Sequence, residues 1–176
     1  MNELITQQES EGVEKRRKRL RGMAADYLLN YDRKRKEYEA RKEDFLAESR
    51  KQGNGHGSQP GKPTETQAVA SVAFDEKNEE SKWLKAVEIT QRGLSDRKRI
   101  FLKVRREAIT KSGGALSFGR PPWRIYVQRR YSEEMRKRYL QLESWISERN
   151  VSAIWQDIVS RTVETFYILD NKVTSF

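Results

Sequence analysis

Apolar side chains recur at three- and four-residue intervals along most of this chain, which is the period of an amphipathic helix. No segment shows the sustained alternation of apolar and polar residues that a half-buried strand requires. The pattern predicts helices over residues 13–51, 64–92, 95–111, 121–142 and 147–170. We therefore predict an all-α protein, in which a long N-terminal helix precedes a C-terminal helical bundle.

The first predicted helix carries an apolar stripe that two cations, Lys34 and Arg41, interrupt. The stripe consists of Leu20, Ala24, Tyr27, Tyr31, Tyr38 and Phe45. Two interpretations stay open: a coiled-coil arm for self-association, or a lone amphipathic helix docked on its own domain. Residues 15–19 at its start are all basic, which suits a contact with nucleic acid or a solvated helix start.

Residues 52–63 separate this helix from the rest of the chain. Four glycines and two prolines among these twelve residues cannot continue a helix. We therefore divide the chain into an N-terminal helical arm at 1–51, a flexible linker at 52–63 and a helical DNA-binding domain at 64–176. The reason for assigning DNA binding to the last part lies in its final two helices and in its charge.

The last two predicted helices follow the order expected of a helix-turn-helix. Pro121 and Pro122 open the first of them, where proline is tolerated. Ser147 caps the second, and Ile146 before the cap and Val151 after it form a hydrophobic staple. A short polar connection joins the two helices, so we predict a helix-turn-helix-like unit in the bundle.

The composition limits the size of the hydrophobic core and indicates the cellular compartment. Hydrophobic residues and charged residues each make up 35% of the chain, against roughly 45–50% and 25% in an average globular domain. The core must therefore be thin. The absence of cysteine excludes disulfides and thiolate metal sites. We see neither a membrane-spanning apolar run nor a signal peptide, and expect a soluble cytoplasmic protein.

The positive charge is concentrated in one part of the chain. Between Arg97 and Arg138 there are 14 Lys/Arg and 3 Asp/Glu, whereas the remaining residues hold 22 basic and 23 acidic side chains. A surplus confined to one window indicates a polyanionic partner rather than general solubility. Double-stranded DNA is the partner that this pattern favours.

The residues that enzymes use are scarce. The single histidine, His56, lies in the predicted linker, and there is no cysteine. The acidic residues between Asp75 and Glu80 do not converge on one side of a helix, so a solvated helix face explains them better than a metal site. We therefore predict no catalytic residue, no metal and no cofactor, and we expect that the protein is not an enzyme.

Two sets of residues are candidates for DNA contacts. The first turn of the last helix carries short polar and guanidinium side chains that suit base edges: Ser147, Glu148, Arg149, Asn150 and Ser152. In this set Arg149 suits guanine, Asn150 adenine and Glu148 the cytosine amino group. Arginines of the basic window suit phosphates: Arg105, Arg106, Arg120, Arg124, Arg129 and Arg130.

The order of these features resembles phage late-gene transcriptional regulators of the ArpU/RinA type, whose C-terminal part is similar to region 4 of sigma factors. The resemblance covers most of residues 27–163. Its leucine, short polar and basic segment matches Leu94-Ser95-Asp96-Arg97-Lys98-Arg99-Ile100-Phe101-Leu102. Its recognition helix matches Ile146-Ser147-Glu148-Arg149-Asn150, followed by Trp155 and Ile158-Val159.

The resemblance implies a sequence-specific regulator that binds double-stranded DNA at a late promoter of a phage or prophage. RNA polymerase is then a candidate second partner, and a homodimer a candidate assembly. The turn before the recognition helix departs from the family, since Glu143-Ser144-Trp145 has no glycine. The alternative that helix 121–139 itself enters the groove therefore stays open. The alternative function is a DNA-recognition, packaging or structural subunit that oligomerises through its N-terminal helix.

Overall fold

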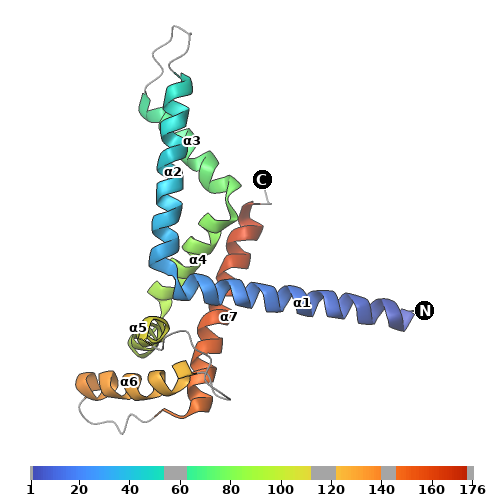
Figure 1. The fold of residues 1–176 in the computed structure, drawn as a ribbon. Coiled ribbons are helices and arrows are strands. Elements are labelled where there is room, and N and C mark those ends of the chain that lie inside the picture. Colours follow the sequence, from blue (N-terminus) through green and yellow to red (C-terminus); the bar gives the residue numbers. More distant parts are fainter. Residues whose placement is uncertain (1, 54–62, 112–121, 140–145, 174–176) are drawn as a thin grey trace.

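The computed structural model describes residues 2–53, 63–111, 122–139 and 146–173, and within these ranges it contains seven helices and no strand. The helices are α1 (Asn2–Leu29), α2 (Tyr31–Gly53), α3 (Pro63–Lys77), α4 (Glu79–Gly93), α5 (Asp96–Lys111), α6 (Pro122–Tyr139) and α7 (Glu148–Val173) (Figure 1). The all-α prediction is confirmed. Most of the predicted linker, including His56, lies outside the described residues.

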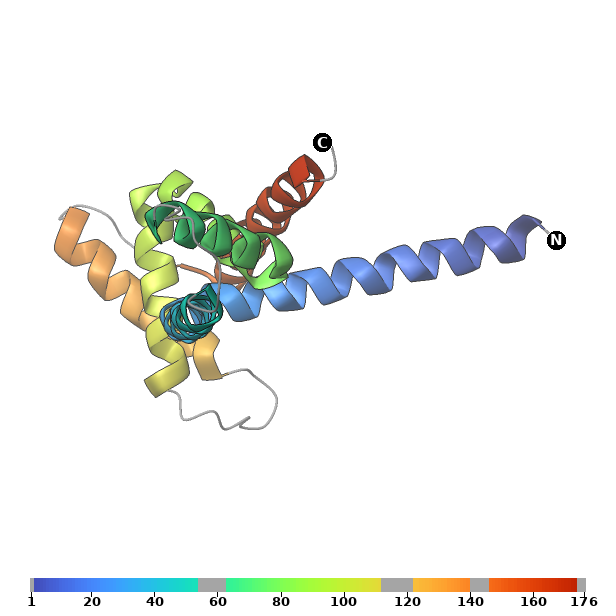
Figure 2. The ribbon, with the colours of Figure 1, turned by 90° about the horizontal axis from the view of Figure 1, so that it is seen from above.

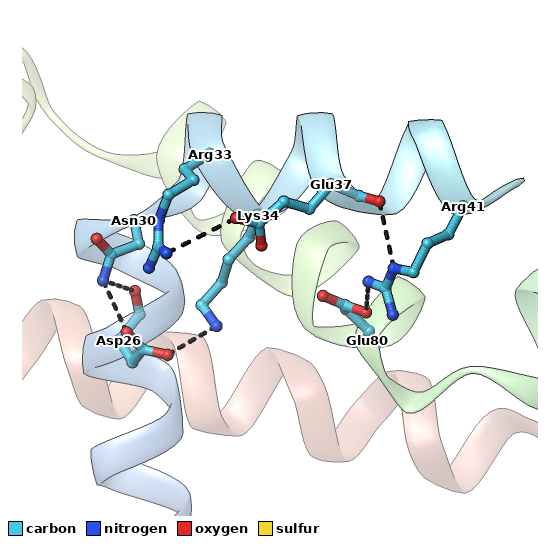
Figure 3. Close-up of polar contacts among 7 residues, drawn as sticks. All are labelled: Asp26, Asn30, Arg33, Lys34, Glu37, Arg41 and Glu80. Carbon is cyan, nitrogen blue, oxygen red and sulfur yellow. Dashed lines mark hydrogen bonds and ion pairs between the residues drawn. The ribbon is translucent and has the colours of Figure 1, made fainter. Parts of the chain in front are cut away.

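The prediction of one continuous N-terminal helix is wrong, because the chain turns at Asn30. α1 ends at Leu29 and α2 starts at Tyr31, and the two helices run in different directions (Figures 1 and 2). The Asn30 amide donates to the Asp26 carboxylate at 2.7 Å and to the Asp26 carbonyl at 3.3 Å. Lys34 of α2 pairs with the same carboxylate at 2.8 Å (Figure 3). These contacts fix the corner between the two helices.

A second asparagine divides the helix predicted over residues 64–92. Asn78 has an extended backbone, with φ −105° and ψ 109°, and separates α3 from α4. Its side-chain amide donates to the Phe74 carbonyl at 2.7 Å. At both breaks an asparagine side-chain amide thus donates to the carbonyl four residues earlier, and at Asn30 the backbone N–H donates to the same Asp26 carbonyl at 2.9 Å.

The core lies where α1 and α4 pack on α7. Trp83 of α4 stacks on Phe166 of α7 with ring centroids 3.9 Å apart, and Tyr27 of α1 stacks on Trp83 at 5.7 Å. Lys82 pairs with Asp170 at 2.7 Å beside this stack, so α4 and α7 are joined by an ion pair as well as by rings. These contacts fix the direction of α7, whose first turn carries the predicted base contacts.

A second part of the core joins α5, α6 and the first half of α7. Phe101 of α5 meets the edge of Tyr131 of α6 at 5.8 Å, and both rings are buried. Apolar side chains at helical spacing predict the inward faces of these helices, and most of them are buried: Ile100, Phe101, Val104, Ala108, Val127, Tyr131, Met135, Val151, Trp155 and Ile158. Trp123, Ile154 and Leu169, which the same spacing predicts to face inward, are only partly buried. The helical period read from the sequence therefore oriented all three helices correctly.

Polar networks attach α2 to its neighbours. The Tyr38 hydroxyl donates to the Asp75 carboxylate of α3, which also accepts from Lys42 at 2.7 Å. The Tyr31 hydroxyl donates to Glu88 of α4 at 2.6 Å. Arg41 pairs with Glu80 (Figure 3). Burial raises the pKa of the Asp75 carboxyl, but the hydrogen bonds from Lys42 and Tyr38 outweigh it, and the pKa is lowered.

We expect Phe166→Ala to lower the free energy of unfolding by roughly 3–5 kcal/mol, because it removes the ring that Trp83 covers and leaves a cavity. Urea denaturation followed by circular dichroism measures the change. Ile168→Ala is the matched control on the same helix, because that side chain is exposed; we expect it to stay within about 0.5 kcal/mol of wild type. Equal losses for the two variants would contradict the described core.

Candidate nucleic-acid interface

The start of α7 is anchored on α6 by a buried hydrogen bond. Gln128 of α6 donates its side-chain amide to the Ile146 carbonyl at 3.0 Å, and both residues are buried. Because a buried amide without a partner is costly, this bond holds the chain just before α7 at one position along α6. Residues 140–145, which contain the predicted turn Glu143-Ser144-Trp145, lie outside the described residues.

Ser147 caps α7 as predicted. Its hydroxyl oxygen accepts the Asn150 N–H at 3.1 Å, and its carbonyl accepts the Val151 N–H at 2.9 Å. Val151 is fully buried and faces the core. The cap and this buried side chain together fix which side chains of the first turn face outward.

The structure brings the predicted base-contacting residues together on this first turn. Arg149 and Asn150 are exposed, and Glu148 and Ser152 are partly exposed. The Arg149 guanidinium forms no ion pair with another described residue. The Ser147 hydroxyl accepts the capping bond and keeps its own O–H for a further contact.

The predicted phosphate-contacting arginines do not form one surface. Arg105 is only 9% exposed, and its guanidinium lies 3.9 Å from the centre of the Trp123 ring and 5.3 Å from that of Trp155. Burial lowers the pKa of Arg105 to about 10. Its position between aromatic rings of α6 and α7 makes it a packing residue that holds the two helices together.

Three further arginines of that set are engaged within the protein. Arg106 donates its Nε–H to the Leu28 carbonyl at 2.8 Å, which satisfies an acceptor at the end of α1. Arg130 pairs with Glu134 at 2.8 Å and with Glu133 at 3.0 Å. Hydrogen bonding to Glu133 raises the pKa of Arg130. Arg124 is half-buried beside Trp123, with 5.6 Å between guanidinium and ring centre.

Arg129 is the member of the set that the structure leaves open to solvent. Its side chain is 85% exposed, with a long contact of 3.8 Å to Glu133. Arg120 lies outside the described residues. The charge of Arg129 is therefore exposed to solvent, as on the first turn of α7. The charges of Arg105 and Arg106 are not, because these side chains are engaged within the protein.

Other cations that the sequence interpretation had not assigned to phosphates are exposed here. Arg136 and Lys137 follow Arg129 on α6 at helical spacing, and Lys103 lies on α5. Arg138 pairs with Asp96 at 2.9 Å, so its charge is partly compensated. The spacing of Arg129 and Arg136, seven residues apart, could have identified this outward stripe from the sequence.

Comparison of the chain with protein-family models, with curated protein sequences and with solved structures found no match. Among the described residues, no three His, Cys, Asp or Glu side chains gather where they could hold a metal ion. None of the helices, over the residues that the structure describes, combines the length and the apolar character needed to cross a membrane.

We expect the arginines to differ sharply in their reaction with phenylglyoxal. Arg129 and Arg149 should be modified quickly in the folded protein, whereas Arg105 should react more than about tenfold more slowly, because its modification requires local opening of the core. Peptide mapping by mass spectrometry gives the rate at each residue. Denatured protein is the control, in which the three rates should converge. Rapid modification of Arg105 in the folded protein would refute its place between the tryptophans.

Proposed function

We propose that this chain is a sequence-specific double-stranded DNA-binding protein that regulates transcription at a late promoter of a phage or prophage. In this proposal α6 and α7 form a helix-turn-helix-like unit, and the first turn of α7 reads base edges in the major groove. The observation that carries the proposal is the Gln128–Ile146 hydrogen bond, which fixes the exposed first turn of α7 relative to the cationic side of α6.

The side chains on the first turn of α7 have complementary chemistry for bases. The Arg149 guanidinium can donate two hydrogen bonds to guanine, and the Asn150 amide matches the donor and acceptor of adenine. Glu148 lies on the same turn, and a carboxylate can accept a hydrogen bond from a cytosine amino group. The N-terminal end of a helix also carries partial positive charge, which favours an approach to the DNA backbone.

Phosphate contacts are reassigned in this proposal. Arg129, Arg136 and Lys137 on α6, together with Lys103 on α5, are exposed and take this role. Arg105 contributes by holding Trp123 and Trp155, and thereby α6 and α7, in place. The proposal needs no cofactor and no catalytic residue. RNA polymerase stays a candidate second partner, and a homodimer would imply two half-sites.

One observation favours the alternative of a DNA-recognition, packaging or structural subunit. Residues 12–19 of α1 are exposed, and the N-terminal end of α1 extends beyond the other helices (Figure 2). A helix that extends in this way suits contacts between subunits. A ring-shaped oligomer, measured by analytical ultracentrifugation and electron microscopy, would favour this alternative, whereas a monomer or dimer would favour the regulator.

The first test is selection of binding sites from a pool of random duplexes, followed by affinity measurements across a salt series. We expect one sequence family to bind roughly 10³-fold or more tightly than random duplex at physiological salt. Equal binding of all duplexes, with a collapse at high salt, would reduce the basic surface to a non-specific electrostatic contact and refute sequence-specific regulation.

The variants Arg149→Ala and Arg136→Ala should fail in different ways. Arg149→Ala should cost roughly 1–3 kcal/mol on the selected site and relax the preference at one base pair. Arg136→Ala should weaken binding to all duplexes equally. It should also reduce the slope of log affinity against log salt concentration by about 1. Arg33→Ala, on the exposed side of α2, is the control and should change neither quantity. A uniform loss from Arg149→Ala would contradict its role in reading a base.

A further inference from the structure

A groove lies between α1 and α7, away from the first turn of α7. Its volume is about 460 Å³. α1 contributes Val13 and three arginines, Arg16, Arg17 and Arg21, and α7 contributes Val163 and Tyr167 from its second half. The groove thus combines apolar side chains with a cationic rim, and the DNA-reading proposal does not use it.

The apolar stripe of α1 continues into this groove. Leu20 and Ala24 lie on the side of α1 that is buried in the core. Val13 is seven residues before Leu20, which places it on the same side of the helix. Val13 is nevertheless 65% exposed. The stripe that is buried at Leu20 and Ala24 is therefore largely exposed at Val13.

Positive charges outnumber negative ones around the groove. Arg16 and Arg17 are exposed and form no ion pair with a described residue. Arg21 donates to the Ser160 hydroxyl at 3.1 Å, a neutral partner. Glu164 is the one acidic residue among those that line the groove. A ligand that brings carboxylates to the rim and apolar side chains to Val13 and Tyr167 would complement this surface.

We propose that the groove between α1 and α7 docks an acidic amphipathic helix of a partner protein. Its apolar side chains would contact Val13 and Tyr167, and its carboxylates would pair with Arg16 and Arg17. Such a partner uses both features of the groove, as amphipathic helices do when they bind in grooves. The proposal stands apart from DNA reading by α7, and either can fail without the other.

The same features argue against two other occupants. A DNA duplex offers phosphates to the arginines but no apolar face to Val13 and Tyr167. A second copy of α1 would bring its own residues 15–19, which are five consecutive cations, against the arginine rim. Like charges placed opposite one another disfavour that pairing.

The experiment is a selection of random 20-residue peptides displayed on phage, with the full-length protein immobilised. We expect the enriched peptides to carry an excess of Asp and Glu, with apolar residues at positions i, i+3 or i+4, and i+7. A synthetic peptide with the enriched sequence then gives affinities by fluorescence anisotropy. Failure to enrich acidic amphipathic sequences would overturn the proposal.

Variants separate the apolar contact from the charge. Val13→Ser should weaken binding of the peptide about fivefold, because it removes most of the contact area of one valine. Arg17→Gln should weaken peptide binding about threefold to tenfold. Val69→Ser is the matched control, since Val69 on α3 is 69% exposed and distant in sequence from the groove; Arg33→Gln is the control for charge. Both controls should bind as wild type does, and thermal unfolding should show unchanged midpoints for all four variants.

Two results would overturn the assignment of the partner. If Val13→Ser binds the enriched peptide as tightly as wild type, the apolar side chain takes no part in docking. If a random 20-base-pair duplex displaces the peptide, and duplex binding falls in Arg17→Gln but not in Val13→Ser, the occupant is nucleic acid. Loss of site-specific DNA binding in Arg149→Ala, with peptide affinity retained, would show that the two surfaces act separately.

Discussion

The stack of Tyr27, Trp83 and Phe166 is the contact on which the arrangement of the helices depends. It joins α1, α4 and α7 at one point, and the Trp83 ring is fully buried between its two neighbours. In a chain that is only 35% hydrophobic, large aromatic side chains supply much of the buried apolar area. The Trp83 indole N–H also donates to Glu79 at 3.2 Å, so the buried ring has a partner for its polar atom. α5 and α6 also pack on α7, whose direction this stack fixes.

Because the core is thin, several of the other contacts combine charged groups with apolar or backbone groups. Arg105 fills the space between Trp123 and Trp155 where a larger core would use a leucine or phenylalanine. Arg106 reaches the end of α1 and satisfies the Leu28 carbonyl. Long basic side chains can cover apolar surface with their methylene groups while they donate hydrogen bonds. Part of the positive charge is therefore structural.

The sequence was sufficient to predict the helical periods but not the positions where the helix axis changes direction. The stripes on α5, α6 and α7, and the cap at Ser147, follow from local spacing and were predictable. The breaks at Asn30 and Asn78 were not, because the apolar period runs through both positions and a period does not register a change of axis. Asparagine is a weak helix former whose amide binds nearby backbone groups, and that was the available signal. Arg105 was also readable: it lies four residues after Phe101 and three before Ala108, on the buried side of α5.

The charge count along the sequence also did not predict which cations are exposed on the folded protein. Within the basic window, Arg105, Arg106 and Arg130 are engaged internally and Lys98 pairs with Asp157, which leaves Arg129, Arg136 and Lys137 as the displayed charge of α6. In the N-terminal half the acidic and basic residues nearly balance in number, yet Asp26 pairs with Lys34 and Glu39 with Arg35. At residues 15–19, Arg16 and Arg17 are exposed and form no ion pair with a described residue. Because pairing removes charges locally, the folded chain displays a positive region on α6 and a second one at the start of α1, and the net surplus counted between Arg97 and Arg138 indicated the first of these alone.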